Sequence, residues 1–303
     1  MSIVEVANLH KKFKNFAAIK NLSLAVNKGE IFGIIGPDGA GKTTFLRILA
    51  GVIAPDAGTI ESCGVDVVKD PEAMKDKIGV MPQNFSLYPD LTIEENLKFF
   101  GRMYGVPKAE FETRKERLLR ITNLAPFSKR RAEHLSGGMQ KKLALISSLL
   151  HTPLLLLLDE PTTGVDPVSR RELWDFFYDL LKAGTTIIVS TPYMDEAERC
   201  SRVGFIYQGE MLLVDEPTKM KNNYPYNIFE ISGPQREHID VTRFPESFRV
   251  IDFYAVGDTL HLVCDQCAVD QVQRFLLDQK GRFNIKNIEP SFEDVFIALI
   301  SKK

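Results

Sequence analysis

Cysteine is scarce in this 303-residue chain, which contains only four. Four scattered cysteines in a chain of this length do not form a disulfide framework, and a reducing cytosol is compatible with them. Two of them form the motif Cys264-Asp-Gln-Cys267, but no second Cys or His pair accompanies it. We therefore expect two half-buried residues near a strand end rather than a metal or redox site.

An excess of positive charge is also lacking, since the formal net charge is −2. Without a basic field, we expect no nucleic-acid partner. The most apolar segment, Leu143–Leu158, contains His151 and Pro153 and is too short to span a bilayer comfortably. The N-terminus has no cationic region followed by an apolar stretch, so we expect no signal peptide and a soluble chain.

Internal repeats and low-complexity tracts are absent, and the length predicts about two domains. Strand and helix patterns alternate as far as about residue 215, which indicates an α/β core domain over 1–220. From about 84 to 150 the pattern is continuously helical, which predicts an inserted helical subdomain. Strands are expected at Ile3–Asn8, Ile19–Val26, Ile31–Ile35, Ile78–Met81, Leu154–Leu158, Thr185–Val189 and Arg202–Tyr207.

The pattern changes near Tyr224, and a separate small α/β domain is expected over 225–303. We find no catalytic or ligand-binding motif in this segment. Its predicted strands are Ile228–Ser232, Arg249–Phe253, Leu260–Cys264 and Phe283–Ile288, with helices at Asp270–Gln279 and from Ser291.

The segment from Gly36 to Thr43 carries the pattern GxxxxGK[ST] between the apolar strand Ile31–Ile35 and a helical run. In that context glycines let successive N–H groups face phosphate oxygens, and the helix N-terminus favours negative charge. Lys42 would reach the β- and γ-phosphates, and the Thr43 hydroxyl would bind Mg²⁺. The predicted nucleotide-binding residues are Gly36, Pro37, Asp38, Gly39, Ala40, Gly41, Lys42, Thr43 and Thr44.

An acidic pair, Asp159-Glu160, follows the apolar run Leu154–Leu158. The carboxyl end of a buried parallel strand lies where such sheets bind ligands. Asp159 would hold Mg²⁺ through its water shell, and Glu160 could accept a proton from the attacking water. The alternative is an ordinary strand end without chemistry.

A third motif, Leu135-Ser-Gly-Gly-Met-Gln140, places two glycines in the first turn of a helix headed by Ser136. Glycine lowers the stability of a helix, so its presence there indicates that the function requires a backbone without side chains. The exposed N–H groups of such a helix start make an anion-binding site. Together with the phosphate loop and the acidic strand end, this motif resembles the ATP-binding cassette (ABC) ATPases over residues 1 to about 220.

The resemblance implies roles for further residues. Phe13 matches the aromatic residue that stacks on adenine, with Phe16 as the competing candidate. Gln83 matches the glutamine that touches Mg²⁺ and the attacking water while coupling to the membrane partner. Ser136, Gly137 and Gly138 match the signature, which contacts ATP held by another subunit, and Thr163–Asp166 matches the loop crossing that dimer interface.

The tail Ile288–Phe296 resembles the ending of drug- and antibiotic-export subunits, which work with separate integral membrane permeases. The resemblance therefore implies an ATPase that powers an exporter from the cytoplasmic face of the cell membrane. It implies ATP and Mg²⁺ as cofactors, and a homodimer or a heterodimer with a second ABC ATPase. The implied catalytic residues are Glu160, Gln83 and Lys42; the implied metal-binding residues are Thr43, Gln83 and Asp159.

Two residues depart from the family pattern. Pro192 stands where the family has a histidine that hydrogen-bonds the γ-phosphate, and Asp38 stands where it has a neutral residue. Tyr193 or Thr191 could substitute for that histidine. Otherwise a regulatory ATP-gated clamp with weak hydrolysis is the rival hypothesis. A second rival is a cassette protein acting on ribosomes or DNA, but the usual paired cassettes or inserted coiled coils are not seen in the sequence.

Overall fold

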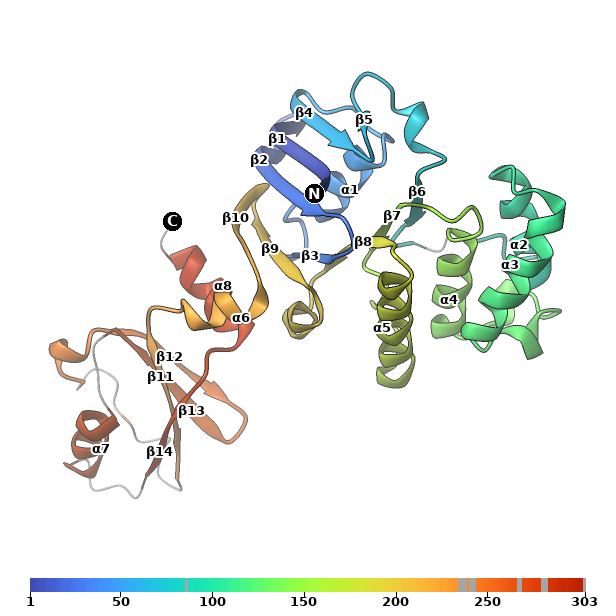
Figure 1. Cartoon of the computed structure of the whole chain (residues 1–303). Coiled ribbons are helices and arrows are strands. Elements are labelled where there is room, and N and C mark those ends of the chain that lie inside the picture. The colour runs from blue at the N-terminus through green and yellow to red at the C-terminus, as the bar shows by residue number, and fades with distance from the viewer. Residues whose placement is uncertain (85–86, 234–238, 240–243, 266–268, 279–282, 302–303) are drawn as a thin grey trace. The chain divides into compact units, whose positions relative to one another are not determined.

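The computed structural model describes residues 1–84, 87–233, 239, 244–265, 269–278 and 283–301 (Figure 1). The chain divides into two compact units, Met1–Pro217 and Thr218–Lys303. Within the described residues, none of the helices has both the length and the apolar character that crossing a bilayer requires.

A six-stranded sheet forms the centre of the first unit, with the strand order β10-β9-β3-β8-β7-β6. All pairings are parallel except that of β10 with β9. Every residue of β3, β7 and β8 is buried, as predicted for parallel strands covered on both faces. The strands are β3 (Ile31–Ile35), β6 (Ile78–Met81), β7 (Leu155–Asp159), β8 (Thr186–Thr191), β9 (Arg202–Tyr207) and β10 (Glu210–Asp215).

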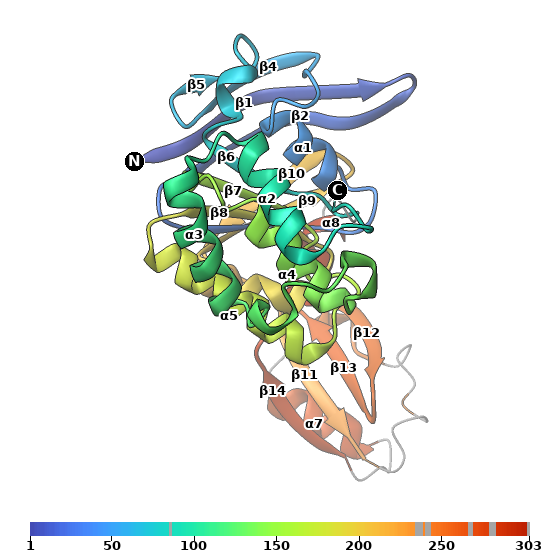
Figure 2. The ribbon, with the colours of Figure 1, turned by 90° about the vertical axis from the view of Figure 1, so that its right-hand side faces the viewer.

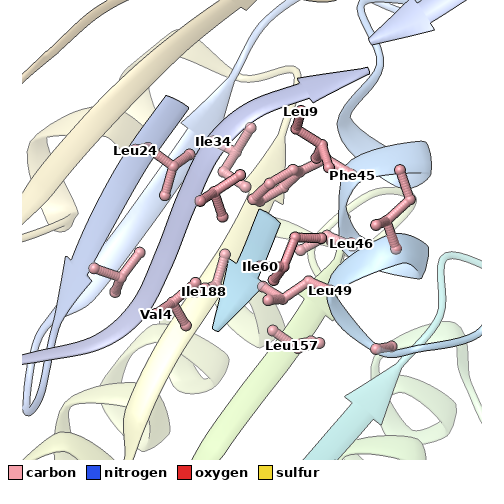
Figure 3. Packing of buried hydrophobic residues seen from close by; sticks show 14 of the residues in the cluster. Val4, Leu9, Leu24, Ile34, Phe45, Leu46, Leu49, Ile60, Leu157 and Ile188 are labelled. Carbon is pink, nitrogen blue, oxygen red and sulfur yellow. The ribbon is translucent and has the colours of Figure 1, made fainter. Parts of the chain in front are cut away.

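A second, antiparallel sheet in this unit has the order β2-β1-β4-β5. Its strands are β1 (Ser2–Phe13), β2 (Phe16–Asn27), β4 (Ala57–Ser62) and β5 (Val65–Asp66). Helix α1 (Lys42–Leu49) shares a core with both sheets (Figure 3). In that core Phe45 and Leu49 of α1 pack with Val4 and Ile60 of the small sheet and with Leu157 of the large one. This packing fixes the helix that follows the phosphate loop.

Four further helices belong to the first unit: α2 (Ile93–Met103), α3 (Lys108–Ile121), α4 (Gly137–Ser147) and α5 (Pro167–Lys182). Figures 1 and 2 show α2 and α3 grouped with α4 beside the large sheet. A capping box begins α2, since the Thr92 side chain accepts from the Glu95 N–H and the Glu95 carboxylate accepts from the Thr92 N–H. Short 3₁₀ turns lie at Glu72–Met74, Ala125–Phe127, Ala132–His134 and Met194–Arg199.

The second unit is built on an antiparallel sheet of order β12-β13-β11-β14. Phe229, Leu262 and Leu276 belong to its buried core. Ser291 and Asp294 cap α8 reciprocally, which explains part of the tail motif as a helix start. The elements are α6 (Pro217–Asn222), β11 (Asn227–Ser232), a 3₁₀ turn (Glu246–Phe248), β12 (Val250–Val256), β13 (Thr259–Cys264), α7 (Val269–Asp278), β14 (Asn284–Ile288) and α8 (Phe292–Ser301).

The structure differs from the sequence predictions in several elements. The first two strands are longer than expected, because Lys11–Phe13 pairs with Phe16–Ile19 beyond the apolar pattern. Strands β4, β5 and β10 and helix α6 were not predicted, since their short segments have no distinct period of their own.

Cys264 is a further correction. It is fully buried at the end of β13 and is disulfide-bonded, whereas a half-buried residue without a disulfide was expected. The number of cysteines argued against a framework of several disulfides, but it could not exclude a single one. Cys267 lies outside the described residues.

Candidate functional site

The phosphate loop connects the end of β3 to the start of α1, as the motif predicted. Gly36 passes so close to β9 that a Cβ there would lie 2.1 Å from the Ile206 carbonyl oxygen. Gly41 has a φ of 112°, and a Cβ there would lie 2.6 Å from the Ala18 carbonyl oxygen. Only glycine fits these two positions, so the loop keeps its backbone bare where α1 begins.

A cavity of about 300 Å³ opens at this loop. It is bounded by the start of β2, the phosphate loop, the segment after β6 and the residue that follows β7. Its lining residues are Phe16, Ala18, Asp38, Gly39, Ala40, Gly41, Lys42, Thr43, Thr44, Gln83 and Glu160.

Lys42 is buried at the base of the cavity, with 4% of its side chain exposed. Its Nζ donates to the carbonyl oxygens of Gly36 at 2.8 Å and Pro37 at 3.1 Å. The same nitrogen lies 3.5 Å from Oε1 of Glu160. The ammonium is therefore held by the loop itself and by the predicted base.

Asp159 lies at the end of β7, facing α1. Its Oδ1 accepts from the Thr43 hydroxyl at 3.1 Å and from the Ser190 hydroxyl at 2.7 Å. The two predicted metal-binding oxygens of Thr43 and Asp159 are thus neighbours. The contribution of Ser190 was not predicted, because a serine on a neighbouring buried strand has no distinguishing sequence signal.

Glu160 has a left-handed backbone with φ of 49°. For a residue with a Cβ this conformation costs about 1–2 kcal/mol. Its N–H donates to both the carbonyl and the hydroxyl oxygen of Ser190, each at 3.1 Å, which holds the turn in place. The turn places the Glu160 side chain where its Oε2 accepts from Gln83 Nε2 at 2.9 Å and from the Thr163 hydroxyl at 3.3 Å.

Lys141 of α4 reaches the same place from the helical subdomain. Its Nζ donates to the main-chain oxygen of Gln83 at 2.9 Å and lies 3.5 Å from that of Glu160. Burial lowers the pKa of Lys141, although the charges of Glu160 and Asp159 oppose this shift. The sequence did not single out Lys141, because it is one of two adjacent lysines without a motif of their own.

Two aromatic residues were candidates for adenine stacking, and the structure separates them. Phe16 lines the cavity, whereas Phe13 does not. Phe13 pairs with Phe16 across the β1–β2 hairpin, and the Lys11 ammonium lies 5.5 Å from the centre of its ring. Of the two candidates, Phe16 is therefore the one that borders the cavity, and which ring stacks on adenine stays a prediction.

Ser136, Gly137 and Gly138 form the start of α4 and do not line the cavity of their own chain. The Ser136 hydroxyl caps α4 by accepting from the Met139 N–H at 3.3 Å. A Cβ on Gly138 would lie 2.6 Å from the Ser169 hydroxyl of α5, so this glycine serves helix packing. Ser136 and Gly137 are exposed.

The segment after β8 carries Pro192 and is bound to α5 by several side-chain contacts. Arg170 of α5 lies over the Tyr193 ring at 4.2 Å and pairs with buried Glu196, its Nε 3.1 Å from Oε1. The same carboxylate oxygen accepts from the Trp174 indole at 3.2 Å. Residues 191–193 are not among the residues that line the cavity, and substitution of Tyr193 or Thr191 for the histidine stays a prediction. A 3₁₀ turn over Met194–Arg199 follows this segment.

The comparisons with known proteins agree on one family. Residues 19–163 match the family model described as "ABC transporter". The chain is 37% identical over 302 residues to the "Probable multidrug ABC transporter ATP-binding protein YbhF" of Escherichia coli (strain K12), covering 99% of this chain and 52% of that protein. The chain thus spans about half the length of that relative. It is 39% identical over 305 residues to the "Nod factor export ATP-binding protein I" of Paraburkholderia xenovorans (strain LB400), covering 99% of this chain and 97% of that protein.

Solved structures show the same fold. A dimeric ATP-binding cassette in a post-hydrolysis state with ADP and Pi matches with a TM-score of 0.65 and 27% identity, covering 70% of this chain and 98% of that chain. The cbiO1 protein of Clostridium perfringens, part of the ABC transporter complex cbiONQ, matches with a TM-score of 0.67 and 25% identity, covering 73% of this chain and 91% of that chain.

Proposed function

Because this chain belongs to the ATP-binding subunits of the ABC transporter family, we propose that it binds and hydrolyses ATP to power an exporter. The observation that supports this best is the convergence of Lys42, Thr43, Gln83 and Glu160 on one cavity, with Asp159 hydrogen-bonded to Thr43. These are the groups that phosphoryl transfer needs for binding charge and activating water. The rival clamp is not favoured, because the relatives named above are transporter and export proteins.

Binding of the polyphosphate requires Lys42 to change partners. Without a ligand, its ammonium is satisfied by two loop carbonyls and by Glu160. We propose that the β- and γ-phosphates take the place of Glu160, because phosphate oxygens make strong charge-assisted bonds with an ammonium. Glu160 then keeps Gln83 and Thr163 as partners and is free to accept a proton from water.

Thr43 and Asp159 fit Mg²⁺, because the ion prefers oxygen ligands and is commonly held by one or two protein groups together with substrate phosphates. Bound there, Mg²⁺ would neutralise charge that develops on the phosphates. The hydroxyl of Ser190 holds the Asp159 carboxylate in position, and Gln83 orients the attacking water beside Glu160. Phe16 is proposed to stack on the adenine ring.

A dimer is proposed because Ser136 and Gly137 are exposed and lie outside the cavity of their own chain. One of the similar solved cassettes is a dimer. In such an arrangement Ser136–Gly138 of each subunit would contact the nucleotide bound by the other. Thr163–Asp166 would lie at the interface. The partner is a second copy of this chain or another ABC ATPase.

Integral membrane permeases are the proposed transport partners, and the protein would act at the cytoplasmic face of the membrane. A cluster of apolar side chains on and before α2 is the proposed docking surface. Tyr88, Phe99 and Met103 are exposed there, and the Tyr88 and Phe99 rings lie 4.5 Å apart. Tyr88 follows Gln83 by only a few residues in the chain. A partner bound to this cluster would therefore shift the segment that carries Gln83, and with it the wall of the cavity.

Charging this docking surface should release the protein from membranes. We expect Phe99→Glu combined with Met103→Glu to reduce recovery in the membrane fraction at least tenfold, because carboxylates cannot be buried unpaired in an interface. ATP affinity should stay within twofold. Leu277→Glu is the matched control, since Leu277 is an exposed apolar residue of the second unit. Equal membrane recovery of the double variant and the wild type would disprove this docking surface.

Restoring the histidine at Pro192 should raise turnover. We expect Pro192→His to increase kcat by about 10²-fold, because removing one preorganised donor to developing charge costs roughly that much. ATP affinity should not improve, since the donor acts mainly on the transition state. Loss of proline from a loop costs only about 0.4–1 kcal/mol of stability, which melting curves would check. An unchanged kcat in a well-folded variant would mean that another group already fills the role.

A further inference from the structure

Lys141 joins three segments that are far apart in the sequence. It belongs to α4, which lies between α5 and the pair α2 and α3 (Figure 1). Its Nζ donates to the main-chain oxygen of Gln83, which follows β6, and approaches that of Glu160, which follows β7. The two proposed water-handling residues are therefore held at their backbones by one side chain from the helical subdomain.

The targets of Lys141 distinguish it from an ordinary surface lysine. Its partners are carbonyl oxygens rather than a carboxylate, so the contact fixes the position of the main chain. The neighbouring Lys142 is different, since its ammonium pairs with the Glu172 carboxylate of α5. Both lysines anchor α4, but only Lys141 reaches the cavity residues.

Lys141 also lies one helical turn beyond Ser136–Gly138, the exposed start of the same helix. A helix moves as a rigid element, so a displacement of its first turn is carried to Lys141. We propose that Lys141 is a positioning residue that links the signature end of α4 to Gln83 and Glu160 of the same subunit. This inference rests on the proposed function, because it assigns a coupling role within that ATPase.

The consequence is a connection between two nucleotide sites in one dimer. Contact of Ser136–Gly138 with nucleotide in the other subunit sets the position of α4. Lys141 then sets the main chain of Gln83 and Glu160, and with it the alignment of the water and its base. Small displacements of such groups are costly, since an error of about 1 Å lowers the rate by up to about 10²-fold.

The kinetic test uses Lys141→Met, which keeps the length of the side chain and removes its charge and donors. We expect kcat to fall about tenfold while the Kd of ATP, measured by calorimetry, stays within twofold. Lys141→Arg should restore most of the rate, because a guanidinium also donates to two carbonyls. Lys142→Met is the matched control and should keep the wild-type kcat.

A double-mutant cycle separates positioning from general support of the helix. If Lys141 acts through Gln83, Lys141→Met should lower kcat much less in a Gln83→Ala background than in the wild type. Equal effects in both backgrounds would contradict the proposal. So would a Lys141→Met variant that matches Lys142→Met in kcat.

Hydrogen exchange tests the contact without relying on turnover. Peptides covering residues 79–84 and 155–163 should exchange faster in Lys141→Met than in Lys142→Met or the wild type. If the wild type hydrolyses no ATP, the proposed function fails, and exchange still decides whether Lys141 positions these segments. Unchanged exchange together with an unchanged kcat would overturn the role of Lys141 while leaving the ATPase assignment intact.

Discussion

Replacement of Glu160 by glutamine should lower ATP turnover by roughly 10²–10⁴-fold, the usual contribution of a general base. The substitution keeps the shape of the side chain, and its amide oxygen can still accept from Gln83 Nε2. Only basicity and charge are lost. ATP affinity should be maintained or rise, because Lys42 no longer has Glu160 as a competing partner at 3.5 Å.

Steady-state turnover and calorimetric ATP binding on the same preparation would measure both effects. Glu61→Gln is a suitable control, since Glu61 is an exposed carboxylate of β4 outside the cavity. A trapped ATP-bound dimer in gel filtration would accompany the loss of turnover. Hydrolysis at the wild-type rate in Glu160→Gln would show that another residue is the base.

Truncation of Lys42 to alanine should weaken ATP binding by about 10- to 10²-fold. Hydrogen bonds to charged groups contribute about 1.5–3 kcal/mol, which corresponds to this range of affinity. The substitution lowers the affinity for ATP directly, because the phosphate charge would then lack its buried cation. Glu160 keeps the donors Gln83 and Thr163, so we expect the variant to remain folded.

Calorimetry of Lys42→Ala beside Lys75→Ala would isolate this effect. Lys75 is an exposed lysine of the same unit that pairs with Glu72 on the surface. Its removal should leave the ATP affinity within twofold of the wild type. Equal affinity of Lys42→Ala and the wild type would remove Lys42 from the phosphate site.

The parts of the site that could be predicted are encoded by short contiguous patterns. The phosphate loop needs bare backbone at Gly36 and Gly41, and the sequence carries those glycines at a fixed spacing between a strand and a helix. The apolar run before Asp159 has the length and composition of a doubly covered strand, and β7 is buried throughout. Ser136 caps the helix that it was expected to begin.

The parts that could not be predicted depend on contacts between distant segments. Ser190 and Lys141 acquire their roles only because β8 and α4 are packed beside β7 and the segment after β6. Which of Phe13 and Phe16 borders the cavity was also not predictable, since no local pattern shows which member of a hairpin pair faces it. The disulfide at Cys264 was likewise not predicted, because the number of cysteines does not show which of them lie close together in the fold.

The packing of Trp174 against Glu196 has a practical consequence, since the chain contains one tryptophan. All indole fluorescence of this protein therefore comes from a side chain that is fully buried on α5 and hydrogen-bonded to the segment that follows Pro192. A shift of that segment changes the polarity around the indole and with it the emission wavelength. The protein thus carries an intrinsic optical reporter, requiring no label, for movement of the segment that follows Pro192.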